Sequence, residues 1–364
     1  MQRRRWITAS ASLALGCVIP SAAVAQSSPP LRVVTSFSVL ADLVQQVGGD
    51  RVTVHSLIGL DGHAHAFEPR PSHVKSMLGA KLLVLNGLEF EPWAERLIRS
   101  AQFKGEALTV SNGMPHPLRS QKKTDARRSQ PPVDPHAWQN PRNVGHYVQV
   151  IADALCRIDP AMTARYRANA RAYQADLLAL DAWIEDQFNT LRPGQRRAIT
   201  SHQAFAYFAE RYQIEFLAPQ GLSSESRPSA QAVARLIKQI QSEGIKAVFL
   251  EHLSDNRLLQ QIAKDTGVTP GPKLFVESLT SKGGGAESYV QMMRHNAQAL
   301  ADGINTGDPY YDLVDSRLRF FGGTTAIWGG RCSRYDALDF HRRDWVDASG
   351  WPLTSAELEP FYAK

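Results

Sequence analysis

The sequence predicts an α/β protein in which one long helix joins two lobes of mostly parallel sheet. Two features of the 364-residue chain lead to this prediction. Short runs rich in β-branched residues alternate with amphipathic helical runs, as is typical of right-handed βαβ units. An unusually long helical run then separates the first four predicted strands from the last four.

The first predicted strand is RVVTSF at 32–37, and apolar residues recur at helical spacing in the segment SVLADLVQQVGG that follows it. We predict further strands at 51–58, 81–87, 107–113, 197–201, 214–219, 245–251 and 273–278. Helical patterns separate most of these runs. The order of elements therefore favours parallel sheets flanked by helices.

The long helical run covers residues 161–191 and has no internal glycine or proline. A helix of about thirty residues is about 45 Å long at 1.5 Å per residue. We therefore expect a rigid linking helix (160–191) between an N-terminal lobe (31–159) and a C-terminal lobe (195–304).

A secretory signal peptide is predicted at residues 1–25. The basic triplet at 3–5 precedes an apolar run that ends in AVAQ, which favours cleavage after Ala25 and a periplasmic location. Serine and proline interrupt this short run, which argues against a transmembrane anchor. Two other export signals remain open: RRRWI resembles a twin-arginine signal, and the residues before Cys17 resemble a lipoprotein cleavage box.

The composition is that of an ordinary globular protein, with 43% hydrophobic and 21% charged residues. The formal net charge is +6, and three of these charges lie in the signal peptide. The remaining charge is too small to indicate binding to nucleic acid or to a membrane surface. With 3 cysteines in all, an ordinary core rather than a disulfide framework must stabilise the protein.

Four side chains with metal-binding chemistry follow predicted strands or lie in loops between lobe elements: His65, His136, His202 and Glu277. In open parallel sheets, the loops beyond the carboxyl ends of the strands converge on one cleft. Three neutral imidazoles and one carboxylate suit Zn²⁺ in a tetrahedral shell, whereas Mn²⁺ typically draws additional oxygen ligands. The set therefore predicts a divalent transition-metal site, with zinc favoured and manganese as the alternative.

Two neighbouring residues compete for places in this site. His63 lies two positions from His65, and residues two apart share a face of an extended segment. Glu251, at the end of IKAVFLE, is a rival to Glu277. Spacing alone does not choose within either pair. The other histidines are expected to be surface or capping residues: His55, His73, His116, His146, His252 and His295.

Several longer phrases strengthen the metal-site hypothesis: VTSFSVLADLVQQVGGD, HAFEPRPSHV, DPHAWQNPRNV, TSHQAFAYFAERY, EHLSDNRLLQQIAKDTG and SYVQMMRHNAQAL. In order and wording, they resemble the periplasmic zinc- and manganese-binding proteins of ABC importers, the cluster A-I (ZnuA/TroA-like) family. The resemblance covers residues 31–304. It implies two α/β lobes bridged by one long helix, which agrees with the pattern of elements.

The resemblance also implies the ligands. The family's first three ligands match His65 in HAFEP, His136 in DPHAW and His202 in SHQAF. The fourth is normally an aspartate, and Glu277 stands at that position, so the carboxylate arm is longer by one methylene. A second departure is the loop before His136, which is short and basic where many zinc-binding members have a His- and acid-rich segment.

The function implied by the resemblance is that of a non-enzymatic binding protein. It would capture a divalent metal ion between the lobes and deliver it to an ABC permease in the inner membrane, and it is expected to be a monomer that binds no nucleic acid. Ligating imidazoles must be neutral, so affinity should fall as pH drops toward a histidine pKa of about 6.5. An adhesin-like surface protein would share the same metal site.

The alternation of predicted strands and helices ends near residue 305. The segment 308–364, which contains LRFFGGTTAIWGGRC, resembles an internal stretch of glucose-methanol-choline (GMC) flavoprotein oxidoreductases. Such an enzyme also needs a GxGxxG turn for FAD, and this sequence has none. About 57 residues of a much larger domain are too few to build its core. We therefore expect a poorly ordered fused fragment without FAD, and the alternative of a flavin-dependent oxidoreductase rests on this tail alone.

Overall fold

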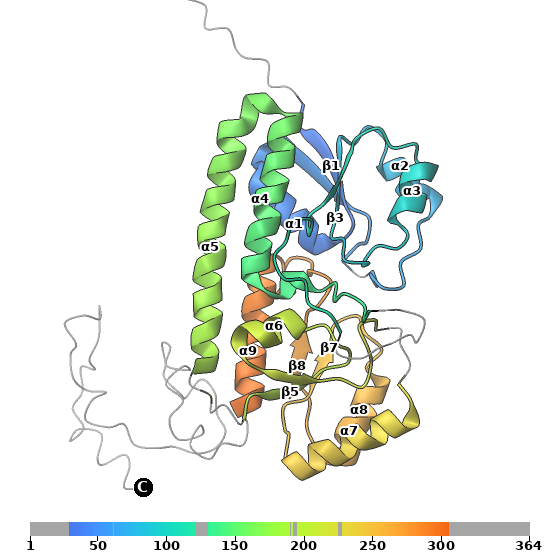
Figure 1. Cartoon of the computed structure of the whole chain (residues 1–364), viewed down its shortest axis with the longest axis vertical. Coiled ribbons are helices and arrows are strands. Elements are labelled where there is room, and N and C mark those ends of the chain that lie inside the picture. The colour runs from blue at the N-terminus through green and yellow to red at the C-terminus, as the bar shows by residue number, and fades with distance from the viewer. Residues whose placement is uncertain are drawn as a thin grey trace, which may run out of the picture.

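The computed structural model describes residues 29–60, 62–120, 130–189, 191, 195–224 and 228–305. Two groups of strands lie one beyond the other along the long axis of the molecule, and the helix α5 (Thr163–Asn189) runs beside them (Figure 1). The fold class predicted from the sequence is confirmed, because every registered strand pair in the described part is parallel.

The first sheet has the strand order β2-β1-β3-β4. Its strands are β1 (Leu31–Thr35), β2 (Val52–Ser56), β3 (Leu82–Leu85) and β4 (Glu106–Thr109). All four residues of β3, LLVL, are buried, as expected for a strand in the middle of a sheet. The helices of this half are α1 (Ser38–Gly48), α2 (Pro71–Ser76) and α3 (Ala94–Ser100), together with the 3₁₀ turn η1 (Gly49–Arg51).

Two antiparallel helices follow the first sheet. The 3₁₀ turn η2 (Ala137–Gln139) leads into α4 (Pro141–Ile158), where Asn140 caps the helix by accepting a hydrogen bond from the Arg142 N–H at 2.9 Å. A second 3₁₀ turn, η3 (Pro160–Met162), precedes α5. The 27 residues of α5 span about 40 Å, so the expected long helix is present.

The second half contains four short strands: β5 (Arg197–Ile199), β6 (Glu215–Leu217), β7 (Phe249–Glu251) and β8 (Gly271–Leu274). They form two parallel pairs, and a single parallel bridge between Ile199 and Val248 connects the pairs. The helices of this half are α6 (Ala206–Tyr212), α7 (Ala230–Glu243), α8 (Arg257–Thr266) and α9 (Tyr289–Asn305).

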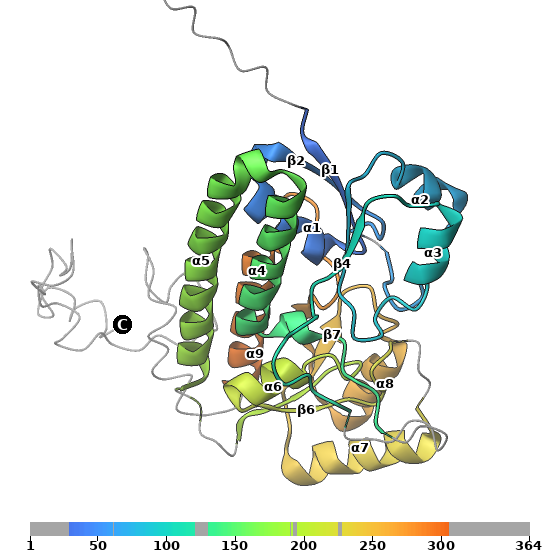
Figure 2. The ribbon, with the colours of Figure 1, turned by 45° about the horizontal axis from the view of Figure 1, so that its top comes forward.

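Helix α9 returns from the second half to pack beside α5 and α1 (Figure 2). At its start, the Tyr289 N–H donates to Asp42 of α1 at 2.8 Å, and the Tyr289 hydroxyl donates to the Trp138 carbonyl at 2.7 Å. One core cluster accordingly contains residues of both halves, including Leu40 and Phe249. The two halves are therefore held together by α5 and also by direct packing.

The strand predicted at 273–278 is partly wrong. The strand β8 ends at Leu274, because Asn296 of α9 takes over the backbone groups of the next residue. The Asn296 side chain accepts from the Phe275 N–H at 2.9 Å and donates to the Phe275 carbonyl at 2.6 Å. Glu277 consequently lies in a bend beyond the strand. The other strands are present but shorter than predicted.

Three segments with sequence-based predictions lie outside the described residues: the signal peptide (1–25), the core of the basic loop (121–129) and the GMC-like tail (308–364). Within the described part, no helix has the length and apolar character needed to cross a membrane.

Candidate metal centre

The structure brings the four predicted ligands together. One ligand atom from each of His65, His136, His202 and Glu277 lies within 4.8 Å of all the others. The three imidazole rings form a nearly equilateral triangle, with centroid separations of 5.5, 5.7 and 5.3 Å. Glu277 Oε1 lies 2.8 Å from His65 Nε2, 3.5 Å from His202 Nε2 and 3.8 Å from His136 Nε2.

Each ligand comes from a different connection. His65 lies in the loop between β2 and α2, and His136 immediately precedes η2. His202 follows β5, and Glu277 follows β8. Both halves of the protein therefore contribute two ligands. Three of the four lie in the connections that follow β2, β5 and β8, at the carboxyl ends of parallel strands, as expected for an open parallel sheet.

Asp134 fixes the orientation of His136. Asp134 Oδ1 accepts from the His136 backbone N–H at 2.8 Å and lies 2.9 Å from His136 Nδ1. Both residues are buried. Because Nδ1 is bound to the carboxylate, the neutral ring presents the lone pair of Nε2 to the cluster.

Glu251 does the same for His202 from a distant part of the chain. Its Oε2 lies 2.5 Å from His202 Nδ1, and its Oε1 accepts from the His202 backbone N–H at 3.0 Å. Ser254 also donates to Glu251 Oε2, at 2.9 Å. Glu251 is therefore turned to the far side of His202, which leaves Glu277 as the carboxylate of the cluster.

The positions of the two side chains also decide between His63 and His65. His63 is exposed and does not belong to the group of four. It lines a small cavity that borders His202 and Glu277. His65 is thus the residue of this segment that reaches the cluster.

Aromatic rings form one wall of the site. The Phe90 ring lies 5.5 Å from His65, and the Trp138 ring lies 5.3 Å from His136, centroid to centroid. Trp138 Nε1 donates to the Val276 carbonyl at 2.8 Å, so this wall also holds the backbone beside Glu277. The apolar wall limits water around the ligands and strengthens the electrostatic interactions among them.

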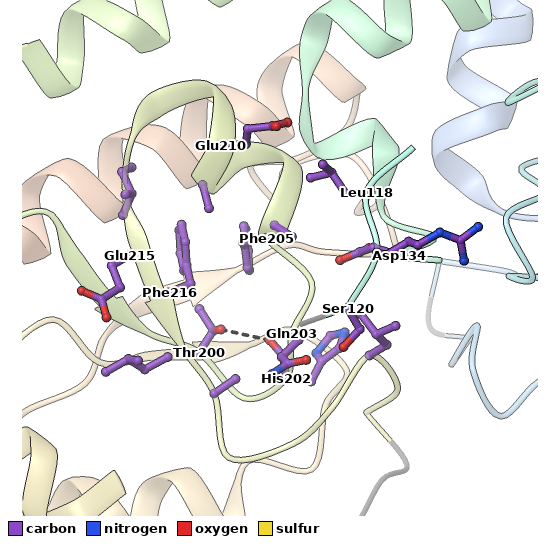
Figure 3. A pocket seen from close by; sticks show the side chains of 17 residues that line it. Leu118, Ser120, Asp134, Thr200, His202, Gln203, Phe205, Glu210, Glu215 and Phe216 are labelled. Carbon is purple, nitrogen blue, oxygen red and sulfur yellow. Dashed lines mark hydrogen bonds between the residues drawn. The ribbon is translucent and has the colours of Figure 1, made fainter. Parts of the chain in front are cut away.

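His202 also lines a wider cavity of about 720 Å³ (Figure 3). The cavity is lined by apolar residues such as Phe205 and Phe216 together with polar residues such as Glu210. Thr200 Oγ1 donates to the His202 carbonyl at 3.1 Å, shown as a dashed line in Figure 3. This bond and those to Glu251 hold His202 at both backbone and ring.

The charges of the metal-free cluster are strongly coupled. Burial disfavours the charged form of His202, but Glu251 and Glu277 outweigh burial and raise the pKa of His202 to about 10. Burial likewise opposes the charged form of His136, but Asp134 raises its pKa above the usual value. Burial would raise the pKa of Glu277, yet the three imidazoles hold it well below its usual value. Protonated imidazoles therefore balance the negative charge of the buried Glu277 carboxylate, a role that a bound cation could also fill.

The donor set fits a divalent transition metal. His65 Nε2, His136 Nε2, His202 Nε2 and Glu277 Oε1 are all buried and lack a hydrogen-bond partner of acceptable geometry. For metal–ligand bonds of about 2.0–2.1 Å, the edges of a tetrahedron are about 3.4 Å long. The three distances from Glu277 Oε1 lie within about 0.6 Å of this length, and the four ligand atoms as a set lie within 4.8 Å of one another, so the imidazoles must draw somewhat closer together around an ion.

Comparison with known proteins agrees with this site. A family model described as the periplasmic zinc-uptake complex component A (ZnuA) matches residues 33–303. The chain belongs to the ZnuA family. It is therefore an extracytoplasmic solute-binding protein of an ABC metal importer that binds a divalent metal ion, and it is not an enzyme.

Two relatives illustrate the range of metals in this family. The chain is 30% identical over 296 residues to the manganese-binding lipoprotein MntA of Halalkalibacterium halodurans, covering 81% of this chain and 95% of the relative. It is 28% identical over 297 residues to the iron-binding protein YfeA of Yersinia pestis, covering 80% and 94%.

Solved structures show the same fold. Mn-bound and Cd-bound forms of a periplasmic metal-binding protein from Candidatus Liberibacter asiaticus are each 26% identical, with a TM-score of 0.66 over 75% of this chain and 99% of theirs. The periplasmic zinc-binding protein TroA from Treponema pallidum is 24% identical, with a TM-score of 0.68 over 76% and 99%.

The sequence did not reveal Asp134, and it indicated Glu251 only as a possible ligand rather than as a carboxylate that orients a histidine. Asp134 stands two residues before His136 in the DPH phrase, which was a usable local signal. Glu251 is 49 residues from His202, and only the fold places them together.

Proposed function

We propose that this ZnuA-family protein captures one zinc ion, in preference to manganese, between His65, His136, His202 and Glu277 and passes it to its permease. The observation that carries the proposal is the convergence of four buried, unpartnered ligand atoms from both halves of the protein. An isolated buried polar atom is costly, and four that face one another provide a site for a cation.

The preference for zinc is supported by the donor set. Three imidazole nitrogens and one carboxylate oxygen suit tetrahedral Zn²⁺, whereas Mn²⁺ favours more oxygen ligands. Manganese or iron remains the alternative, because MntA is named as a manganese-binding protein and YfeA as an iron-binding protein. Glu277 could offer a second oxygen to such an ion.

Transfer to the permease requires only modest movement of the lobes, which we take as residues 31–159 and 195–304. Asp181 of the linking helix accepts from Arg142 of α4 at 2.8 Å and from Arg211 of α6, also at 2.8 Å. Tyr212 donates to the same carboxylate at 3.0 Å. These bonds tie the helices that follow His136 and His202 to one rigid element, which supports small loop shifts over a wide hinge closure.

Export by the N-terminal signal is part of the proposal. We infer cleavage after Ala25 and action as a monomer in the periplasm. The alternative of a lipoprotein signal, cleaved before Cys17, has some support because MntA is named as a lipoprotein. The mass of the mature protein separates the two routes, since a chain that begins at Gln26 has lost Cys17 and carries no lipid.

The zinc proposal is tested on the signal-free full-length protein. We expect about one metal ion per chain by plasma mass spectrometry after equilibration with equal Zn²⁺ and Mn²⁺, and we expect that ion to be zinc. A His136→Ala variant treated identically should lose it. Bound manganese in the wild-type protein would overturn the zinc preference, and no metal in either sample would overturn the assignment of the site.

The flavoenzyme alternative gains no support. The family match ends at residue 303, and the GMC-like tail lies beyond it. We infer that the tail (308–364) is a passenger that binds no FAD. Visible flavin absorbance in the purified protein would contradict this inference.

A further inference from the structure

Cavities in the described part of the chain border the ligands, and three of them can be compared by their linings. The cavity of about 720 Å³ touches His202 and carries Arg119 together with three carboxylates. A cavity of about 340 Å³ touches His65 and carries one carboxylate and Arg96. The third touches both His202 and Glu277, and among the described lining residues it alone of the three offers further imidazoles. Because it borders two ligands and carries additional metal-binding groups, the third cavity is the favoured route to the site.

This third cavity is lined by groups that bind metal ions. His63 lies on the loop that also carries His65, and His252 follows β7. Ser224, Ser254 and Ser278 add hydroxyl groups. The cavity has a volume of about 10 Å³, which is about the space that one water molecule or one ion needs.

The lining residues differ in burial, and this difference shows which side of the cavity is nearer to the solvent. His63 is exposed, His252 is half-buried and His202 is fully buried. The side chain of Glu277, at 14% exposed, is the most accessible of the four ligands. Imidazoles are thus found at the outer side of the cavity as well as at its inner side.

We propose that His63 and His252 form an outer imidazole pair that receives a divalent transition-metal ion and passes it to Glu277 and His202. The proposal rests on the proposed function and adds a route to it. An aqueous ion must exchange its water ligands for protein ligands, and an imidazole at the outer side lets it do so in steps. The four inner ligands remain the final site.

A residue on the route and a residue in the final site have different kinetic effects. A route residue stabilises the path in both directions, so its loss lowers the association and dissociation rate constants by the same factor and leaves Kd unchanged. Loss of a final ligand instead raises the dissociation rate and weakens Kd. The two roles are therefore separable by measuring both rates.

The test is stopped-flow tryptophan fluorescence with Zn²⁺ as the probe, because Trp138 packs 5.3 Å from the His136 ring. We compare His63→Ala and His252→Gln with His55→Ala, a matched control at an exposed histidine of β2. Arg96→Ala tests the rival cavity beside His65. His63 and His55 are both exposed, so their removal leaves the core intact.

We expect His63→Ala and His252→Gln each to slow association and dissociation at least about threefold at unchanged Kd, while His55→Ala and Arg96→Ala behave as wild type. Unchanged rates in both route variants, or faster association in Arg96→Ala, would overturn the proposed route. A weaker Kd in His63→Ala would place His63 in the final site and overturn the proposal as well. If wild-type protein fails to bind Zn²⁺ at equilibrium, the proposed function itself has failed.

Discussion

His136 and His202, which we call the fixed pair, differ from His65 and Glu277, the open pair. The fixed pair is buried, and each ring is held by a buried carboxylate, Asp134 or Glu251. The side chains of the open pair are 10% and 14% exposed. Among the described residues, the polar partner given for the His65 ring is Glu277 of the cluster itself, at 2.8 Å, and the ring packs against Phe90. The comparison suggests that the fixed pair supplies affinity and that the open pair adapts to the ion and admits it.

The largest effect should come from removing a member of the fixed pair. We expect His136→Ala to weaken Zn²⁺ binding by more than about 100-fold, beyond what loss of an orienting partner causes. His65→Ala should cost less, because that ring is not oriented in advance. Isothermal titration calorimetry with a competing chelator measures both constants. A larger loss in His65→Ala than in His136→Ala would contradict the division into two pairs.

Removing an orienting carboxylate should have the next largest effect. Asp134→Asn and Glu251→Gln each keep the side-chain shape but lose the charge that holds the Nδ1–H, and we expect each to weaken Zn²⁺ binding by about 10–100-fold. The matched control is Glu243→Gln, because Glu243 pairs with Arg197 at the surface, away from the site. Equal affinities for all three variants would show that the buried carboxylates do not orient the ligands.

The pH dependence should be steep and should extend above neutrality. The pKa of His202 is raised to about 10 in the metal-free protein, so this ring is protonated at neutral pH and must release its proton to bind a metal. Affinity should therefore rise about tenfold per pH unit for each proton displaced. Titrations at about pH 6, 7 and 8 measure the slope. A pH-independent Kd would refute proton displacement.

The raised pKa of His202 should affect the stability of the metal-free protein in the opposite direction. A raised histidine pKa stabilises the folded state fully below the unfolded value of about 6.5, and this contribution is lost as pH rises through about 10. Metal-free protein should therefore lose stability between these values, while Zn²⁺ becomes more stabilising. Thermal unfolding with and without Zn²⁺ across this range tests the divergence.

The smallest effect should follow a change within the open pair. Glu277→Asp shortens the carboxylate arm by one methylene, and the exposed side of the site should adjust, so we expect Zn²⁺ affinity to change by less than about tenfold. The ratio of Zn²⁺ to Mn²⁺ affinity should change more than in His55→Ala. A loss as large as that of His136→Ala would show that Glu277 is as rigidly required as the fixed pair.

The fold class and the convergence of three histidines were predictable because each depends on local pattern. The long helix is visible as a run without glycine or proline, and His65, His136 and His202 each stand in a distinctive phrase. The choice between Glu251 and Glu277 was not predictable from sequence, since side-chain direction decides it. Asn256 binds both the N–H and the carbonyl of Glu251, at 3.0 and 2.7 Å, and so sets that direction.

The end of β8 was likewise not predictable from the sequence. A short β-rich run predicted a strand over 273–278, but Asn296, 21 residues from Phe275, binds the backbone of Phe275 and ends the strand. Glu277 thereby enters a bend in which its carboxylate reaches the three imidazoles. Contacts between residues distant in sequence thus decided the details of the site.

The most direct test of the account is a crystal structure of the signal-free protein grown with Zn²⁺, with anomalous diffraction recorded on both sides of the zinc absorption edge. We predict one strong anomalous peak bonded to the Nε2 atoms of His65, His136 and His202 and to Glu277, with Glu251 bound to His202 Nδ1. A peak elsewhere, or Glu251 in place of Glu277 as the metal ligand, would contradict it.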